Sequence, residues 1–217
     1  MPTPTILNDT NVCSTLAIEQ VTTETPFKLM MSLQRNLQER LSPHMFVQGR
    51  SCHQIGLDIT YWNYCLRDEL TEVHEWFPFD TPTTHLEASF EIVDALHFLN
   101  NIALELGFTD DEIEESVTQA LDPNYDIPTN YLECEKLVTV ALNTLMKQIP
   151  WKKWRSYSDS ASVAMSKSNI VEALAHVYVA LVIYAQWFGI SSKAVAELYL
   201  AKHRENHARQ DRMAAAG

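Results

Sequence analysis

The sequence predicts an all-α fold, a helical bundle formed by a single domain. Only five of the 217 residues are glycine, and long stretches carry apolar residues at helical spacing instead of alternating with polar ones. Hydrophobic residues make up 46% of the chain, which is enough for a sizeable core. We expect residues 25–217 to form this domain, and residues 1–24, which are polar, Thr-rich and weakly periodic, to be a flexible N-terminal arm.

Two helices are expected first. Residues 26–41 begin with Pro, whose missing N–H group is tolerated in a first turn. Residues 57–77 form a second helix, which Pro78 stops.

Two further helices complete the first half. Residues 84–107 begin with Thr84 and carry Glu87 three positions later, a capping-box pattern, and end at Gly107. Residues 109–121 start the next helix with acidic side chains in its first turn, where the helix dipole favours them.

The second half repeats part of the first. After a linker at 122–130, helices are expected at 131–149, 168–189 and 191–213. The motif IVDAL at 92–96 returns as IVEAL at 170–174, and in both places a long apolar helix follows and ends in Gly. We interpret this as a degenerate internal duplication. The second copy has Asn169 where the first has Glu91, so it looks like a scaffold beside one active site.

Charge is distributed unevenly. The net charge of −12 argues against binding to nucleic acid, which depends on Lys and Arg. From Asp68 to Glu135 there are 18 acidic residues and no Lys or Arg, whereas 136–217 holds 11 basic and 5 acidic residues. We distinguish an acidic half at 57–121 and a basic half at 131–213.

Location is suggested by three absences. The four cysteines form no CxxC pair, and no charged-then-apolar leader opens the chain, so we expect reduced thiols in the cytoplasm. The longest apolar run, 176–190, is shorter than the roughly 20 residues of a membrane span. We expect a buried helix there and no membrane role.

Two pairs of acids predict a metal site. Glu69 and Glu72 lie three positions apart, as do Glu91 and Asp94, so each pair projects from one face of its helix. Such pairs are common on solvated helix faces. The second pair, however, stands among apolar residues, and no cation in the segment neutralises it. Four gathered carboxylates would repel one another unless a divalent ion lay between them, and an all-oxygen set suits Mg²⁺ or Mn²⁺.

A basic stripe predicts phosphate binding. Lys202, Asn206 and Arg209 fall at i, i+4 and i+7 of the last helix. Two cations and an amide on one face suit the phosphates of a nucleotide, although an ordinary solvated helix would give the same pattern.

Four segments together resemble a known family, the all-α nucleoside triphosphate pyrophosphatases of the MazG-like and dimeric dUTPase type, including the T-even-phage type dCTP/dUTP pyrophosphatase. SLQRNLQERL is similar to the base-recognition helix of this family, WNYCLRDELTE to its ExxE helix, FEIVDALHF to its ExxD helix, and YLAKHRENHARQ to its C-terminal KxxxNxxRQ motif. The segments span residues 32–210 in the order of the family.

The resemblance implies Mg²⁺-dependent hydrolysis of dCTP or dUTP to the monophosphate and pyrophosphate, by a homodimer with a four-helix catalytic core. It implies phage origin and hence the host cytoplasm. The implied roles are metal binding and catalysis for the four acids, phosphate binding for the basic stripe, and base or sugar contacts for Gln34, Gln38, Phe98 and Asn101. The deoxynucleotide is the expected partner.

Other interpretations stay open. Phe98 suits a core position, and Gln34 and Gln38 suit surface amides. The DxxH pattern ending at His97 suggests a di-iron bundle, but His176 follows Glu172 by four positions instead of three. A non-enzymatic acidic interaction protein, or the same chemistry on a purine or modified nucleotide, also remains possible. The WKxW element of the family is missing between the acidic pairs, and WKKW occurs at 151–154 instead.

Overall fold

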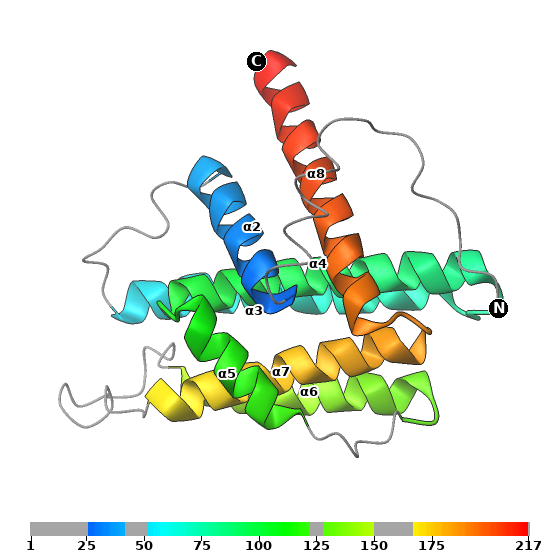
Figure 1. Ribbon diagram of the computed structural model, residues 1–217, viewed down its shortest axis with the longest axis horizontal. Helices are drawn as coiled ribbons and strands as arrows, with labels where there is room; N and C mark the ends of the chain where they lie inside the picture. Colours follow the sequence, from blue (N-terminus) through cyan, green and yellow to red (C-terminus); the bar gives the residue numbers. More distant parts are fainter. Residues whose placement is uncertain (1–25, 42–51, 122–127, 150–166, 217) are drawn as a thin grey trace.

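The computed structural model describes residues 26–41, 52–121, 128–149 and 167–216 (Figure 1). Within these ranges the chain has no strand, and its elements are α2 (Pro26–Leu41), α3 (Cys52–Glu72), the short 3₁₀ helix η1 (Val73–Trp76), α4 (Pro82–Glu105), α5 (Asp110–Ala120), α6 (Tyr131–Gln148), α7 (Lys167–Trp187) and α8 (Ser192–Ala216). The prediction of an all-α fold is confirmed. The N-terminal arm, the WKKW segment and most of the linker at 122–130 lie outside the described residues.

Two helical hairpins form the body of the molecule. Helix α3 packs along α4, and α6 packs along α7, while α4 and α7 join the two pairs. Helices α2 and α8 pack against each other and against α4, and they project to the side opposite α6 and α7 (Figure 1). Helix α4 is therefore surrounded by helices, and its Ile92, Leu96 and Leu99 are fully buried. This central position explains why its sequence is apolar around most of its circumference.

Two helix starts differ from the sequence prediction. Helix α4 begins at Pro82 with Thr81 as its N-cap, and the capping box joins Thr81 to Thr84, so the predicted box of Thr84 and Glu87 is wrong. The reason is Pro82, whose fixed φ suits the first helical position, so α4 starts two residues earlier than predicted. Helix α3 begins at Cys52 instead of residue 57, and η1 completes the segment before Pro78.

The ends of α4 and α5 follow the prediction more closely. Gly107, which follows the C-cap Leu106 of α4, adopts φ +70°, a left-handed conformation that glycine reaches without steric cost. Thr109 is the N-cap of α5, where its side chain accepts a hydrogen bond from the backbone N–H of Glu112. The same glutamate accepts from the backbone N–H of Thr109 at 2.9 Å, which completes a capping box.

Helix α7 is the most apolar element. By length and composition it could cross a membrane, but 67% of its most apolar window is buried inside the protein. It packs against α4, α5, α6 and α8. Its burial agrees with the prediction of a core helix.

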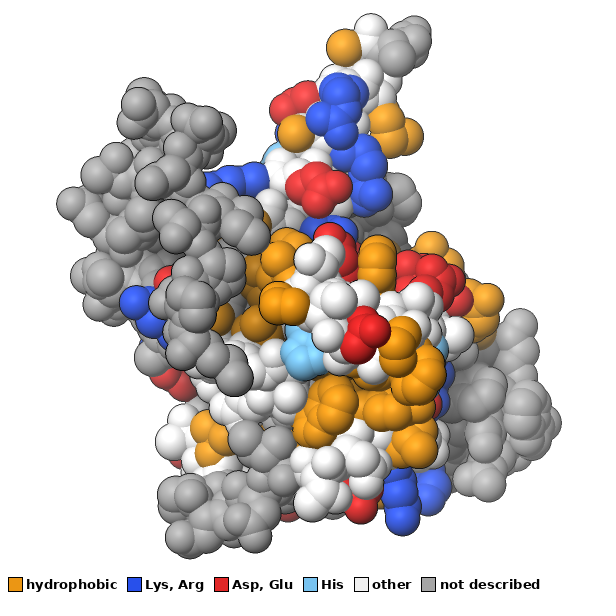
Figure 2. Space-filling model, turned by 90° about the vertical axis from the view of Figure 1, so that its right-hand side faces the viewer, with side chains coloured by type: hydrophobic (Ala, Val, Ile, Leu, Met, Phe, Trp, Pro, Cys, Tyr) orange, Lys and Arg blue, Asp and Glu red, His pale blue; other side chains and the backbone are white. Residues whose placement is uncertain are grey.

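An aromatic cluster closes one end of the bundle. Phe79 lies 5.1 Å from Phe188 and 5.3 Å from Tyr131, measured between ring centroids, and Trp187 lies 4.9 Å from Phe188. Apolar side chains gather on the face at this end (Figure 2). The cluster ties the α3–α4 hairpin to the α6–α7 hairpin.

Candidate active site

One pocket of about 470 Å³ gathers the residues predicted from sequence. Its walls come from α2, α3, α4 and α8, and its size suits a small-molecule ligand. All eleven predicted site residues line it: Gln34, Gln38, Glu69, Glu72, Glu91, Asp94, Phe98, Asn101, Lys202, Asn206 and Arg209. The structure thus brings together side chains that stand up to 175 positions apart in the sequence, 34 to 209.

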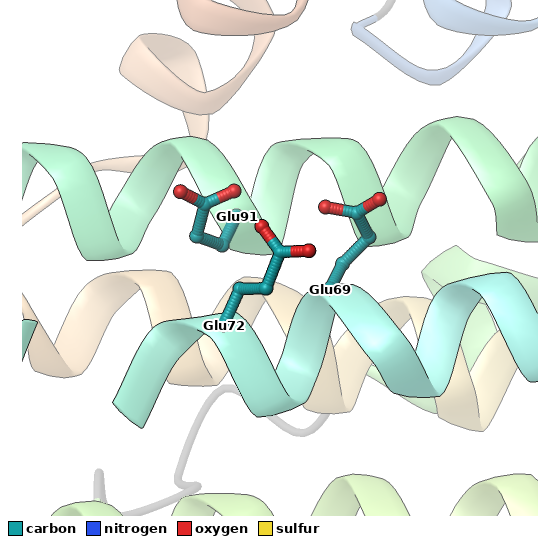
Figure 3. A group of neighbouring side chains, drawn as sticks. All are labelled: Glu69, Glu72 and Glu91. Carbon is teal, nitrogen blue, oxygen red and sulfur yellow. The ribbon is translucent and has the colours of Figure 1, made fainter. Parts of the chain in front are cut away.

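Three carboxylates meet at one end of the pocket (Figure 3). Glu69 and Glu72 project from α3 and Glu91 from α4, and one oxygen from each lies within 4.8 Å of the others. Glu91 also accepts a hydrogen bond of 3.2 Å from Trp76 Nε1 on η1. The short 3₁₀ helix therefore helps to orient one of the three acids.

The electrostatic cost of this arrangement falls mainly on Glu69. Burial, followed by the charges of Asp94, Glu72 and Glu91, raises the pKa of Glu69 to about 7. Burial also raises the pKa of Glu91, although the hydrogen bond from Trp76 opposes the shift. Such shifts are typical of carboxylates held together without enough positive charge.

Asp94 is the fourth predicted ligand and has a different partner. Its Oδ2 lies 2.8 Å from Lys202 Nζ, so an ion pair in the pocket lining joins α4 to α8. Burial raises the pKa of Asp94 in spite of this contact. Burial tends to lower the pKa of Lys202, but its hydrogen bond to Asp94 and the neighbouring acids outweigh burial and raise it. The ion pair thus favours the charged form of each partner, while burial of Asp94 opposes it.

The basic stripe of α8, Lys202, Asn206 and Arg209, lines the same pocket as the acids. Asn206 and Arg209 line the same wall of the pocket as Lys202, and Arg209 donates a hydrogen bond of 2.9 Å to Asn206 Oδ1. Lys and Arg side chains are visible along the projecting part of α8 (Figure 2). The pocket thus has an acidic floor and a basic wall, from opposite halves of the chain.

The other end of the pocket is formed by amides and aromatic rings. Gln34 is only 1% exposed, and its Nε2 donates to Asn101 Oδ1 at 2.7 Å. Gln38 is 4% exposed, and its Oε1 has no hydrogen-bond partner among the described residues. Phe98 stacks on Trp62 with ring centroids 6.0 Å apart. The two glutamines are therefore buried pocket residues, not the surface amides that the sequence also allowed.

Sequence reasoning missed several residues of this end. Trp62 and His97 line the pocket, and Tyr199 donates a hydrogen bond of 2.8 Å to Gln34 Oε1. Burial, with the charges of His203 and Lys202, lowers the pKa of His97 to about 3, so this ring is neutral. The only signal for His97 was its position three residues after Asp94, which pointed to a di-iron site instead.

The di-iron alternative finds no support in the geometry. His97 Nδ1 bonds to Gln34 Oε1 at 2.7 Å, on the amide side of the pocket. Glu172 and His176, its proposed counterparts, lie on the exposed side of α7 and line a separate hollow with α5. The second copy of the repeated motif therefore contributes nothing to the pocket.

A comparison with protein families found a match. The family model described as dUTPase matches residues 26–213, which include α2 to α7 and most of α8. The chain belongs to the dUTPase family. The family resemblance inferred from the four segments is confirmed. Comparisons with curated proteins and with solved structures found no match.

Membership in the dUTPase family sets the general activity. Proteins of this kind are nucleoside triphosphate pyrophosphatases, which release pyrophosphate from a nucleotide. The match covers every helix that lines the pocket. The pocket is therefore the candidate active site of a dUTPase-family enzyme.

Proposed function

We propose that this protein hydrolyses dUTP, dCTP or both to the monophosphate and pyrophosphate in a reaction that requires Mg²⁺. The observation that carries the proposal is the order of the pocket: carboxylates at one end, cations on one wall, and amides with aromatic rings at the other end. A nucleoside triphosphate has the matching order of parts, with its phosphates between a metal and cations and its base against rings. The enzyme would remove one nucleotide from the pool available to polymerases.

The acidic cluster suits a divalent cation. Its ligand atoms are all carboxylate oxygens, which Mg²⁺ and Mn²⁺ prefer, and three of them lie within 4.8 Å of one another. Glu69, Glu72 and Glu91 would hold the ion, and Asp94 would join them when Lys202 turns to the substrate. When bound, the ion supplies positive charge that neutralises phosphate oxygens and acidifies the attacking water.

The chain's own side chains account for the remaining steps. Water attacks the α-phosphorus, and the bond from this atom to the oxygen that bridges the α and β phosphates breaks, so pyrophosphate leaves with that oxygen. One glutamate of the cluster orients the water or accepts its proton. Lys202, Asn206 and Arg209 bind the oxygens of the phosphate chain, where negative charge must be stabilised.

The test is pyrophosphate release from dATP, dCTP, dGTP, dTTP and dUTP, with Mg²⁺ and with chelator. The informative variant is Glu72→Gln, which removes one carboxylate of the cluster but keeps its shape. Glu75→Gln is the matched control, because Glu75 lies three residues further on and is exposed. We expect metal-dependent release from dUTP or dCTP, a loss of at least about a hundredfold in Glu72→Gln, and no change in the control.

Two results would contradict the proposal. Release that is equally fast in chelator would remove the role of the metal. No release from any of the five nucleotides would favour a modified nucleotide or the non-enzymatic interaction protein.

A further inference from the structure

A chain of buried hydrogen bonds runs from the core of the protein to the amide end of the pocket. It begins at Tyr178 on α7, whose hydroxyl bonds to Asn100 Oδ1 on α4. Asn100 Nδ2 donates to the hydroxyl of Tyr199 on α8 at 2.7 Å, and Tyr199 donates to Gln34 Oε1 on α2. All four side chains are at most 1% exposed, so water does not compete with these bonds.

Tyr178, at the end of the hydrogen-bond chain remote from the pocket, determines which group donates in each bond. An amide can be turned over to exchange its donor and its acceptor, so the same atoms could in principle be linked in the opposite direction. In that reversed chain Tyr178 would accept from Asn100, and its own proton would be left with Met31 Sδ at 3.6 Å. A thioether is a weak acceptor, whereas the Asn100 carbonyl oxygen is a strong one. The chain therefore runs from Tyr178 towards the pocket.

This direction determines what the pocket offers to a ligand. Gln34 Oε1 accepts from Tyr199, and since it can only accept, the nitrogen of His97 that contacts it, Nδ1, carries the proton. The neutral ring of His97 then has an unprotonated Nε2, which is buried and has no partner among the described residues. Asn101 uses its oxygen to accept from Gln34 and keeps its Nδ2 as a donor.

We propose that Tyr178, Asn100 and Tyr199 are positioning residues that select an imide base, uracil or thymine, over cytosine. The inference rests on the proposed function, because it assumes that a base occupies this end of the pocket. His97 and Asn101 both bond to the Gln34 amide and both line the pocket. An acceptor at His97 together with a donor at Asn101 complements the N3–H group and a neighbouring carbonyl of an imide. The reversed chain would present a donor at His97 and an acceptor at Asn101, which complement N3 and the amino group of cytosine.

The experiment measures kcat/KM for dUTP, dTTP and dCTP in the wild type and in Tyr178→Phe. The variant removes the hydroxyl that fixes the direction but leaves every residue that lines the pocket. Tyr184→Phe is the matched control, since Tyr184 is a buried tyrosine of the same helix whose hydroxyl has no partner among the described residues. We expect the ratio of dUTP to dCTP turnover to fall by roughly five- to tenfold in Tyr178→Phe, as for the loss of one hydrogen bond, and to stay constant in Tyr184→Phe.

A ratio separates positioning from simple loss of stability, because partial unfolding would lower turnover of both nucleotides equally. Tyr199→Phe, which removes the next hydroxyl of the chain, provides a second variant if Tyr178→Phe does not fold, and its ratio should fall at least as far. A folded, active Tyr178→Phe or Tyr199→Phe enzyme with the wild-type ratio would overturn this inference and leave the proposed function intact. A wild type that prefers dCTP would also overturn it. A wild type that acts on none of these nucleotides would overturn the proposed function itself.

Discussion

At the scale of single residues, Glu69 is the side chain most affected by its surroundings. Its pKa is raised from 4.5 to about 7, first by burial and then by Asp94, Glu72 and Glu91. At a pH between 4.5 and about 7, Glu69 of the folded, metal-free protein keeps a proton that the same residue releases in the unfolded chain. The free energy of unfolding therefore falls as pH rises through this range, and Glu69 lends its stabilisation only at low pH.

This shift makes a prediction for the metal-free protein. In chelator, Glu69→Gln should match the melting temperature of the wild type near pH 4, below the unfolded pKa of 4.5, and exceed it near pH 8, because the amide cannot ionise. Thermal unfolding at several pH values measures the difference, and Glu75→Gln should show none of this divergence. An unchanged difference in melting temperature between wild type and Glu69→Gln at both pH values would mean that neither burial nor the neighbouring carboxylates raise the pKa of Glu69.

Single residues also show how far sequence reasoning reached. The acid pairs could be predicted because their spacing on one helix fixes a common face, and so could the stripe on α8. The hydrogen bonds of Gln34 could not, because its partners His97, Asn101 and Tyr199 are 63, 67 and 165 residues away. No local pattern links such positions.

At the scale of helices, capping makes the next prediction. Thr109→Ala should lower the free energy of unfolding by about 1 kcal/mol, since it removes the side-chain oxygen that accepts from Glu112 N–H at the start of α5. Thr144→Ala is the control, because Thr144 is exposed within α6 and bonds only to a backbone carbonyl of its own helix. Urea unfolding measures both, and a loss as large in the control would show that the cap is not responsible.

Helix starts were the least predictable part of the fold. Thr81 and Thr84 stand three positions apart, and both are followed by plausible first turns, so the sequence alone did not decide which caps α4. The start of α3 at Cys52 was hidden because residues 52–56 have no strong cap signal. The helix ends near Gly107 and Gly189 were easier to predict, because glycine after a helix is a signal for its end. Both glycines indeed adopt the positive φ values that such an end requires.

At the scale of the whole molecule, the pocket explains why one half of the sequence is acidic and the other basic. The acidic half supplies the floor of the pocket through α3 and α4, and the basic half supplies its wall through α8. Among the described residues that line the pocket, the ion pair of Lys202 with Asp94 is the only one between a cation of α8 and the four acids, and Lys202 also lies 3.9 Å from Glu205 of its own helix. The folded state is therefore left with uncompensated negative charge.

Metal should consequently stabilise the fold. At a Mg²⁺ concentration a hundred times its dissociation constant, the free energy of unfolding should rise by about 2.7 kcal/mol. Melting curves against Mg²⁺, with NaCl at equal ionic strength to correct for general screening of the net charge of −12, measure the effect. Glu72→Gln should lose most of the rise and Glu75→Gln should keep it. Equal rises with Mg²⁺ and NaCl would show screening without a specific site.

The place of α4 in the molecule limits how its sequence can change over evolution. Glu91, Asp94, Phe98 and Asn101 reach one pocket from a single uninterrupted helix. Inserting or deleting one residue between Glu91 and Asn101 would rotate one part of the helix against the other by about 100° and shift it by about 1.5 Å. Either the carboxylates or the amides would then leave the pocket. The other faces of this stretch are packed in the core and accept mainly apolar substitutions of similar size, whereas the number of residues between Glu91 and Asn101 is fixed by the pocket.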